Sequence, residues 1–371
     1  MAKKAYVGVG GIARKIKKGY IGIGGKARKI KKAYIGVGGV ARPCWSDGLE
    51  YYGTTTPLSK GRYGLAAASV GDYALFGGGY NDWASSVVDA YNASLTHSTP
   101  AALSTERRGL AATAVGSYAL FGGGNSGGTA YYNKVDSYNT SLTKGTASAL
   151  TVARAYLAAT TVGSYALFGG GWNDAFCSLV VNAYNASLTR STPTALSKER
   201  RHLAATAVGS YALFGGGDDY NNKVTTVDRY NTSLTKGTAS ALTVARAYLA
   251  ATTVGNYALF GGGNEELSSN PVATVDAYDT SLTRSTPIAL SAARSGIGAT
   301  AVGGYALFGG GELGSGNSAI VDAYDENLTR ITLPNLSSAR YGLAATSVGV
   351  YALFGGGSPS ASSAIVDVYA A

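Results

Sequence analysis

The chain has 371 residues, enough for one large domain or two ordinary ones with a sizeable core. It carries 31 Lys and Arg against 21 Asp and Glu, but only 14% of its residues are charged, and 53 are Gly and 27 Tyr. This composition argues against a helical or disordered basic protein. Two Cys and two His, with no apolar run of membrane-spanning length, predict no disulfide framework, metal, cofactor or membrane insertion.

The net positive charge of the chain is confined to an N-terminal arm, residues 1–44. The arm holds nine Lys, three Arg and no acid, a net charge of +12, which leaves −2 for the rest of the chain. It consists of three similar units of 14 residues, 3–16, 17–30 and 31–44, the first reading KKAYVGVGGIARKI. Apolar and basic residues mostly alternate and a Gly-Gly pair marks a turn, which predicts a β-meander with one long strand per unit.

About 44 Gly-rich residues cannot build a core of their own, so we expect the arm to be ordered by a partner or by self-association. We therefore interpret it as an anchoring and assembly element, joined by a junction at 45–49 to the rest of the chain. The predicted anchoring residues are the paired Lys and the Tyr of each unit: Lys3, Lys4, Tyr6, Lys17, Lys18, Tyr20, Lys31, Lys32 and Tyr34.

Residues 50–371 repeat with a longer period. The segment Tyr-Ala-Leu-Phe-Gly-Gly-Gly occurs seven times, from Tyr73 to Tyr351, at spacings of 45 to 48 residues. A strand of small residues precedes each copy, and a variable loop, a Val-Asp-Ala-Tyr-like strand and an outer strand such as 191–197 follow it. Four short antiparallel strands per repeat predict an all-β fold, a seven-bladed β-propeller. Since the last repeat stops after its third strand, we expect an N-terminal outer strand at 54–59 to close the ring.

The repeats resemble the Kelch family in three features: the Gly-Gly after the second strand, the Val-Asp-Ala-Tyr third strand, and an Arg before each inner strand. The Trp usual near the outer strand of that family is replaced by Ser or Thr. The resemblance implies that the variable loops and the Arg-bearing connections lie on one face of the propeller. We expect the repeated Arg itself to be structural and to satisfy carbonyls or the third-strand Asp. Its members are Arg62, Arg107, Arg154, Arg200, Arg246, Arg294 and Arg340.

The loops between second and third strands differ in every repeat and are rich in Tyr, Trp, Asn and Asp. Variable loops of this composition on a rigid scaffold are typical of recognition surfaces, although loops also drift without a function. Arg108, Arg201 and His202, which occur in only some repeats, are further binding candidates because Arg pairs well with carboxylates. The candidate loop residues are Tyr80, Asp82, Trp83, Tyr131, Tyr132, Trp172, Asp174, Phe176, Asp218 and Tyr220.

Catalysis has little support in the sequence. A copper oxidase of propeller architecture would need His ligands and a modified Cys, but His97 and His202 are the only histidines. No sialidase Ser-x-Asp box, Gly-x-Ser-x-Gly elbow or Cys/His pairing is evident. The third-strand acids are spread one per repeat, without the clustering of metal ligands. We predict that the protein is not an enzyme.

The arm units are similar to N-terminal repeats in structural proteins of tailed phages and prophages of Gram-positive gut bacteria. That resemblance implies a virion protein, made in the cytoplasm without a signal peptide and extracellular after lysis. The hypothesis is an arm that binds other virion proteins or copies of itself, and a propeller that binds a host-surface glycan or protein.

Two alternatives remain open. The first is a purely structural role, as virion decoration or as a self-assembling filament protein. The second is an intracellular Kelch scaffold that binds an acidic peptide while its basic arm binds nucleic acid. Nucleic acid is the less favoured partner, because tails that bind DNA are usually disordered whereas these units have strand periodicity.

Overall fold

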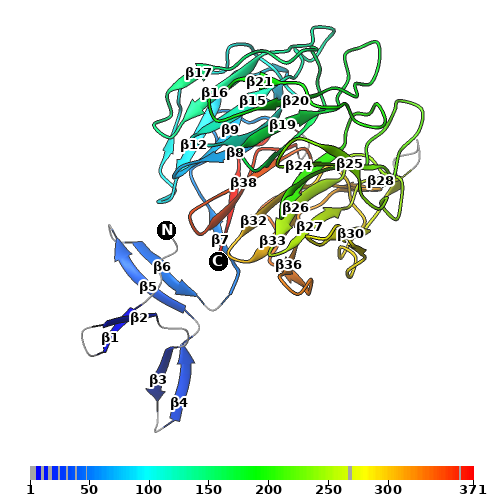
Figure 1. Ribbon diagram of the computed structural model, residues 1–371. Helices are drawn as coiled ribbons and strands as arrows, with labels where there is room; N and C mark the ends of the chain where they lie inside the picture. The colour runs from blue at the N-terminus through cyan, green and yellow to red at the C-terminus, as the bar shows by residue number, and fades with distance from the viewer. Residues whose placement is uncertain are drawn as a thin grey trace.

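The computed structural model describes residues 48–265, 270–358 and 361–371, and before them the backbone of six strands between Tyr6 and Ser46. Within these residues every regular element is a β-strand, and seven four-stranded antiparallel sheets form a seven-bladed β-propeller (Figure 1). The predicted fold class is confirmed. In each of the first six blades the chain runs from the inner strand outward, and neighbouring strands pair in sequence order.

The inner strands consist mainly of Ala, Ser, Thr and Val, small enough for seven strands to surround one axis. Alternate residues are buried and half-buried because they point to opposite sides of the strand. In the first blade Ala66 and Ala68 pack toward the second blade, and Ser69 hydrogen-bonds to Thr346 of the seventh. They are β8 (Ala66–Val70), β14 (Ala111–Val115), β18 (Ala158–Val162), β22 (Ala204–Val208), β26 (Ala250–Val254), β32 (Gly298–Val302) and β38 (Ala344–Val348).

The second and third strands supply the core. Phe76 packs edge-on against Tyr91 with ring centroids 6.0 Å apart, and the other six blades repeat this pair. The second strands are β9 (Tyr73–Gly77), β15 (Tyr118–Gly122), β19 (Tyr165–Gly169), β23 (Tyr211–Gly215), β27 (Tyr257–Gly261), β33 (Tyr305–Gly309) and β39 (Tyr351–Gly355). The third strands are β12 (Val88–Asn92), β16 (Val135–Asn139), β20 (Val181–Tyr184), β24 (Val227–Asn231), β30 (Val275–Tyr278), β36 (Val321–Asp325) and β40 (Val366–Ala370).

The core consists of seven apolar layers between neighbouring blades rather than one central mass. Each buried cluster combines side chains of two adjacent blades, and the seven clusters close the circle. Gly77 shows how closely the blades approach, because a Cβ atom there would lie 2.7 Å from the ring of Phe121 in the next blade. The Gly that ends the second strand is therefore a packing requirement.

The outer strands are short, and the first one in the chain closes the ring. Glu50–Thr54 pairs antiparallel with β40 and completes the last blade, as predicted, but the expected bounds of 54–59 are wrong. After Thr54 the chain continues beside the blade without strand pairing, although Thr55 and Leu58 still donate to the Val366 and Ala364 carbonyls, and 192–197 likewise lies beyond its outer strand. The outer strands are β13 (His97–Ser98), β17 (Lys144–Thr146), β21 (Arg190–Ser191), β25 (Lys236–Thr238), β31 (Arg284–Ser285), β37 (Arg330–Leu333) and β7 (Glu50–Thr54).

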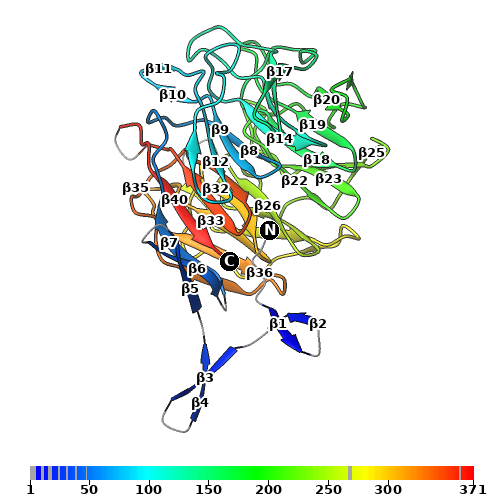
Figure 2. The same ribbon diagram turned by 90° about the vertical axis from the view of Figure 1, so that its left-hand side faces the viewer.

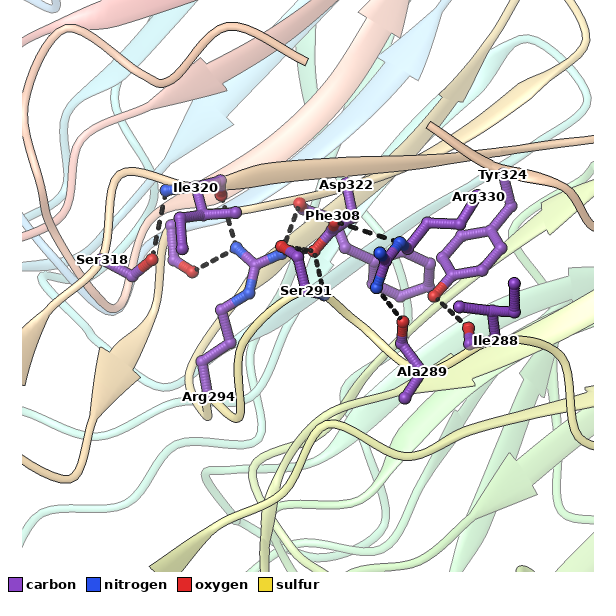
Figure 3. Close-up of polar contacts among 11 residues, drawn as sticks. Ile288, Ala289, Ser291, Arg294, Phe308, Ser318, Ile320, Asp322, Tyr324 and Arg330 are labelled. Carbon is purple, nitrogen blue, oxygen red and sulfur yellow. Dashed lines mark hydrogen bonds and ion pairs between the residues drawn. The ribbon is translucent and has the colours of Figure 1, made fainter. Parts of the chain in front are cut away.

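The repeated Arg fastens each connection to the blade that follows it. In the sixth blade Arg294 and Asp322 are fully buried and form an ion pair (Figure 3). The Arg294 guanidinium also donates to the Phe308 and Gly310 carbonyls at 3.3 and 2.9 Å, and Ser291 donates to Asp322. The expectation that this Arg is structural is confirmed. The pair lies within one blade, and in the third blade Asn182 accepts from Arg154 in place of the acid.

The arm forms three separate two-stranded hairpins, not the expected meander with one strand per unit (Figure 1, dark blue). Both strands of the first hairpin lie within the first unit, where Val9 pairs with Ile12, so a unit contributes two strands instead of one. Among the predicted anchoring residues, Lys3, Lys4, Lys17, Lys18 and Lys31 lie outside the described residues. The arm strands are β1 (Tyr6–Val9), β2 (Ile12–Lys15), β3 (Gly19–Ile23), β4 (Lys26–Ile30), β5 (Lys32–Val37) and β6 (Val40–Ser46), so Tyr6, Tyr20, Lys32 and Tyr34 are strand residues.

Candidate functional site

One face of the propeller collects the variable loops and the connections between blades. In every blade the residue that follows the repeated Arg forms a β-bridge with the residue that follows the Gly-Gly-Gly segment. We call this side of the propeller the loop face. One of its loops forms a hairpin of β10 (Tyr80–Asn81) with β11 (Trp83–Ala84), labelled in Figure 2. Another forms a hairpin of β34 (Glu312–Leu313) with β35 (Gly316–Asn317). A third hairpin joins β28 (Asn264–Glu265) to β29 (Asn270–Pro271). The bridged pairs are Tyr63–Tyr80, Arg108–Asn125, Ala155–Trp172, Arg201–Asp218, Ala247–Asn264, Ser295–Glu312 and Tyr341–Ser358.

Five predicted residues meet on this face in what we call the Arg201 cluster: Trp172, Arg201, His202, Asp218 and Tyr220. The rings of Trp172 and Tyr220 stack at 5.3 Å with 10° between their planes. The Arg201 guanidinium carbon lies 4.8 Å from the Trp172 ring and 5.3 Å from the Tyr220 ring. Arg201 Nε donates to Asp218 Oδ1 at 2.9 Å, so one carboxylate orients a cation against two aromatic faces.

Asp218 is the centre of the cluster because its second oxygen, Oδ2, lies 2.9 Å from His202 Nδ1. Although burial by itself raises the pKa of Asp218, its hydrogen bonds with His202 and Arg201 lower that pKa below its ordinary value. Burial lowers the pKa of His202 despite the neighbouring carboxylate. Asp218 is therefore ionised and His202 neutral near pH 7, and the Arg201–Asp218 pair has no net charge.

A second grouping, the Arg108 cluster, lies two blades earlier and comprises Tyr63, Tyr80, Arg108 and Asn125. The Arg108 guanidinium carbon lies 4.4 Å from the Tyr80 ring centroid, and Tyr80 meets Tyr63 edge-on at 5.6 Å. Asn125 occupies the repeat position that Asp218 holds in the Arg201 cluster. Within the described residues Arg108 has no carboxylate partner, so this cluster keeps a positive charge.

The remaining predicted residues are dispersed over the loop face. Trp83 is 77% exposed at the β10–β11 hairpin, next to Asp82, and Phe176 is 53% exposed in the third blade's loop beside Asp174. Trp83 shares its hairpin with Tyr80 of the Arg108 cluster, and Phe176 lies in the same loop as Trp172 of the Arg201 cluster.

Tyr131 and Tyr132 are neighbours in sequence with different surroundings. Burial raises the pKa of Tyr131, as does the nearby Asp174, while hydrogen bonds with Trp172 and Asn125 lower it. Tyr131 thus connects the two clusters. Tyr132 belongs to the scaffold, because its carbonyl accepts from the backbone N–H of Arg154.

Sequence reasoning missed four residues of this face: Tyr63, Tyr156, Tyr248 and Tyr341. Tyr248 stacks on the His202 ring at a centroid distance of 4.0 Å, and Tyr156 contacts the same ring at 4.8 Å in a tilted arrangement. A signal for Tyr156 and Tyr248 was present, because the residue immediately before the Leu or Ile that precedes each inner strand is Gly in four repeats and Tyr, His and Tyr in three consecutive ones. Three residues, Tyr156, His202 and Tyr248, are the exceptions to Gly at this position of the repeat.

The loop face also carries a free thiol, Cys177, besides its aromatic and charged groups. In the described residues no group of three or more His, Cys, Asp and Glu is placed to hold a metal ion. Burial raises the pKa of the free Cys177 thiol to about 11, which makes it a poor nucleophile, and its Sγ contacts the Asp218 carbonyl oxygen at 3.6 Å. The site offers aromatic faces, paired charges and amides.

The fold and this face define a class: a seven-bladed β-propeller with an aromatic, arginine-bearing loop face. No helix of the described residues is long and apolar enough to cross a membrane. No family model matches the chain, and no curated protein matches it.

Proposed function

We propose that this chain is a non-enzymatic, Kelch-like virion protein of a tailed phage or prophage, whose loop face binds a host-surface glycan or protein. The observation that carries the proposal is the concentration of exposed apolar side chains. Of the seven large ones in the described residues, five lie on the loop face: Trp83, Phe176, Leu179, Tyr220 and Tyr248. Exposed aromatic groups gathered on one face are typical of binding surfaces.

The scaffold beneath this face supports the proposal because it is rigid. Each connection is held by a buried Arg whose guanidinium has protein hydrogen-bond acceptors, and by a third-strand Tyr such as Tyr138, whose hydroxyl donates to the Ala101 carbonyl at 2.7 Å. Loops held in place before binding lose little conformational entropy when a ligand arrives. The variable loops therefore act as a preorganised surface.

The arm supports the anchoring half of the proposal. Its three hairpins have two strands each, and a two-stranded hairpin alone is marginally stable in water. Each hairpin has strand edges on which a partner strand can add. Anchoring through other virion proteins or through a second copy of the arm would order these strands and leave the propeller free.

The first experiment measures binding of the full chain to cell walls from a panel of Gram-positive gut bacteria. We expect the wild type to bind at least one wall and Trp172→Ala to bind it at least tenfold more weakly, because stacking area is lost. Ile288→Ala is the matched control. Ile288 is 65% exposed, and its carbonyl accepts from the hydroxyl of Tyr324, near the end of β36 that is opposite the variable loop. Equal binding by the Trp172 and Ile288 variants would contradict the proposed binding face.

The second experiment deletes residues 1–44 in the phage. We expect particles that lack the protein, while the truncated chain remains a soluble, folded propeller. Particles that still contain the truncated protein would exclude anchoring by the arm. A protein that enters particles but binds no wall would instead be a decoration.

A further inference from the structure

Seven residues form a closed ring of backbone hydrogen bonds on the loop face, one residue from each blade. Each N–H donates to the carbonyl of the equivalent residue in the preceding blade, at N···O distances of 2.7 to 3.1 Å. All seven residues have a positive φ, between 51° and 64°. We call them the axial ring: Gly64, Gly109, Tyr156, His202, Tyr248, Gly296 and Gly342.

The fold does not require the three side chains of this ring. Gly accommodates a positive φ without steric cost, whereas Tyr and His are strained there. Four blades close the ring with Gly, so the hydrogen bonds form equally well without a side chain. Three consecutive blades keep strained aromatic residues that the scaffold could replace by Gly.

The same strain recurs on the loop face. Twelve non-Gly residues of the described chain have a positive φ, and six of these are the Leu of a turn that recurs in six blades. The other six all belong to the loop face: Asp82, Tyr156, Asp174, His202, Tyr220 and Tyr248. Strained residues cluster where a structure serves a ligand rather than stability.

We call three contacting rings the aromatic crescent: Tyr156, His202 and Tyr248. The His202 side chain is only 10% exposed, so the two Tyr rings provide most of the accessible surface. His202 lies between the other two, 4.8 Å from Tyr156 at 47° and 4.0 Å from Tyr248 at 20°. Asp218 holds the His202 ring, and Tyr248 is 44% exposed. Elsewhere in the ring Gly64 leaves open space where a side chain would be, whereas Gly342 lies against the Tyr63 side chain.

We propose that the aromatic crescent is the ligand subsite of the loop face and binds an uncharged sugar ring over the axis of the propeller; this rests on the proposed function. The C–H faces of a pyranose match an aromatic platform, and the Tyr hydroxyl groups at its rim match sugar hydroxyl groups. Asp218, which contacts His202, is paired with Arg201, so this carboxylate presents no unpaired charge to the crescent. The crescent therefore favours a neutral hexose over an acidic sugar.

The test uses the full-length chain and its Tyr248→Gly variant, which carries at position 248 the residue that four other blades have. Binding is measured to bacterial walls as purified, after periodate oxidation of sugar diols, and after protease treatment. We expect Tyr248→Gly to bind at least tenfold more weakly with an unchanged or higher Tm, because Gly relieves the strained φ. Tyr248→Phe keeps the stacking face and is expected to bind within threefold of the wild type.

The outcomes distinguish a failure of the crescent proposal from a failure of the proposed function. Loss of wild-type binding after periodate but not after protease supports a sugar ligand, and the reverse result overturns it. Wild-type affinity in Tyr248→Gly overturns the crescent but leaves binding by the loop face intact. Competition by uronic-acid oligosaccharides and not by neutral hexose oligosaccharides overturns the uncharged ligand. A wild type that binds no wall contradicts the proposed function itself.

Discussion

Arg200 and Arg201 are neighbours in the chain and belong to opposite regions of the molecule. Arg200 is fully buried and paired with Asp228, and equivalent Arg residues hold every blade. Arg201 lies on the loop face against Trp172 and Tyr220, and only Arg108 matches it in another blade. Successive side chains of an extended segment point to opposite sides, so one dipeptide serves both the scaffold and the surface. In this protein the repeated Arg residues stabilise the blades, and the variable residues form the proposed binding face.

The largest expected effect is on the scaffold side of this comparison. Arg200→Ala leaves the buried Asp228 carboxylate without its partner, which costs about 3–5 kcal/mol of unfolding free energy. Urea unfolding followed by circular dichroism measures this loss. Asp228→Asn is the milder control, because Asn182 occupies the same position in the third blade. A loss below about 1 kcal/mol in Arg200→Ala would mean that the buried pair does not hold the blade.

In the third blade a single substitution can create the buried ion pair that the other blades have. Burial lowers the pKa of Arg154 to about 10, since Asn182 provides no negative charge. Asn182→Asp should therefore stabilise the propeller by about 1–3 kcal/mol, the value of a hydrogen bond to a charged group. Thermal unfolding at pH 7 detects the change. A lower Tm would show that desolvation of the new carboxylate exceeds its attraction to Arg154.

On the surface side, Arg201→Ala should change binding and not folding. We expect at least tenfold weaker binding to the cell wall, about 1.4 kcal/mol, since Trp172 and Tyr220 lose the cation that orders them. The unfolding free energy should fall by no more than about 1 kcal/mol, because Asp218 retains its hydrogen bond with His202. Arg108→Ala tests whether the second cluster contributes separately. If Arg201→Ala lowered the unfolding free energy as much as Arg200→Ala does, the distinction between a scaffold Arg and a surface Arg would be wrong.

The smallest expected effect is a pH dependence. Burial holds the pKa of His202 below its ordinary value, so the unfolded chain takes up a proton there that the folded chain does not. Stability is complete above about pH 6.5 and falls as pH drops below that value, by about 1 kcal/mol at pH 5.5. Tm values at pH 7.5 and 5.5 for the wild type and His202→Asn isolate this contribution. Asn tolerates a positive φ, and His97 contributes equally to both proteins. Identical pH profiles would contradict a neutral, buried His202.

Local pattern determined much of this protein. The period of Tyr-Ala-Leu-Phe-Gly-Gly-Gly implies seven blades, and the buried Arg294–Asp322 pair matches the structural role predicted for the repeated Arg. These features are readable because each repeat encodes its own strands, turns and packing. Loop composition also identified most members of the Arg201 cluster.

Only the tertiary structure decided what meets at the axis. Tyr156, His202 and Tyr248 are separated by 46 residues each, and no local signal states that their rings stack. Ring closure brings equivalent positions of all blades together, and backbone hydrogen bonds then impose a positive φ on each of them. Closure likewise assigned the last outer strand to Glu50–Thr54. The net charges of +12 for the arm and −2 for the propeller follow from composition alone. The proposed aromatic crescent, in contrast, forms only when closure of the ring brings its three residues together.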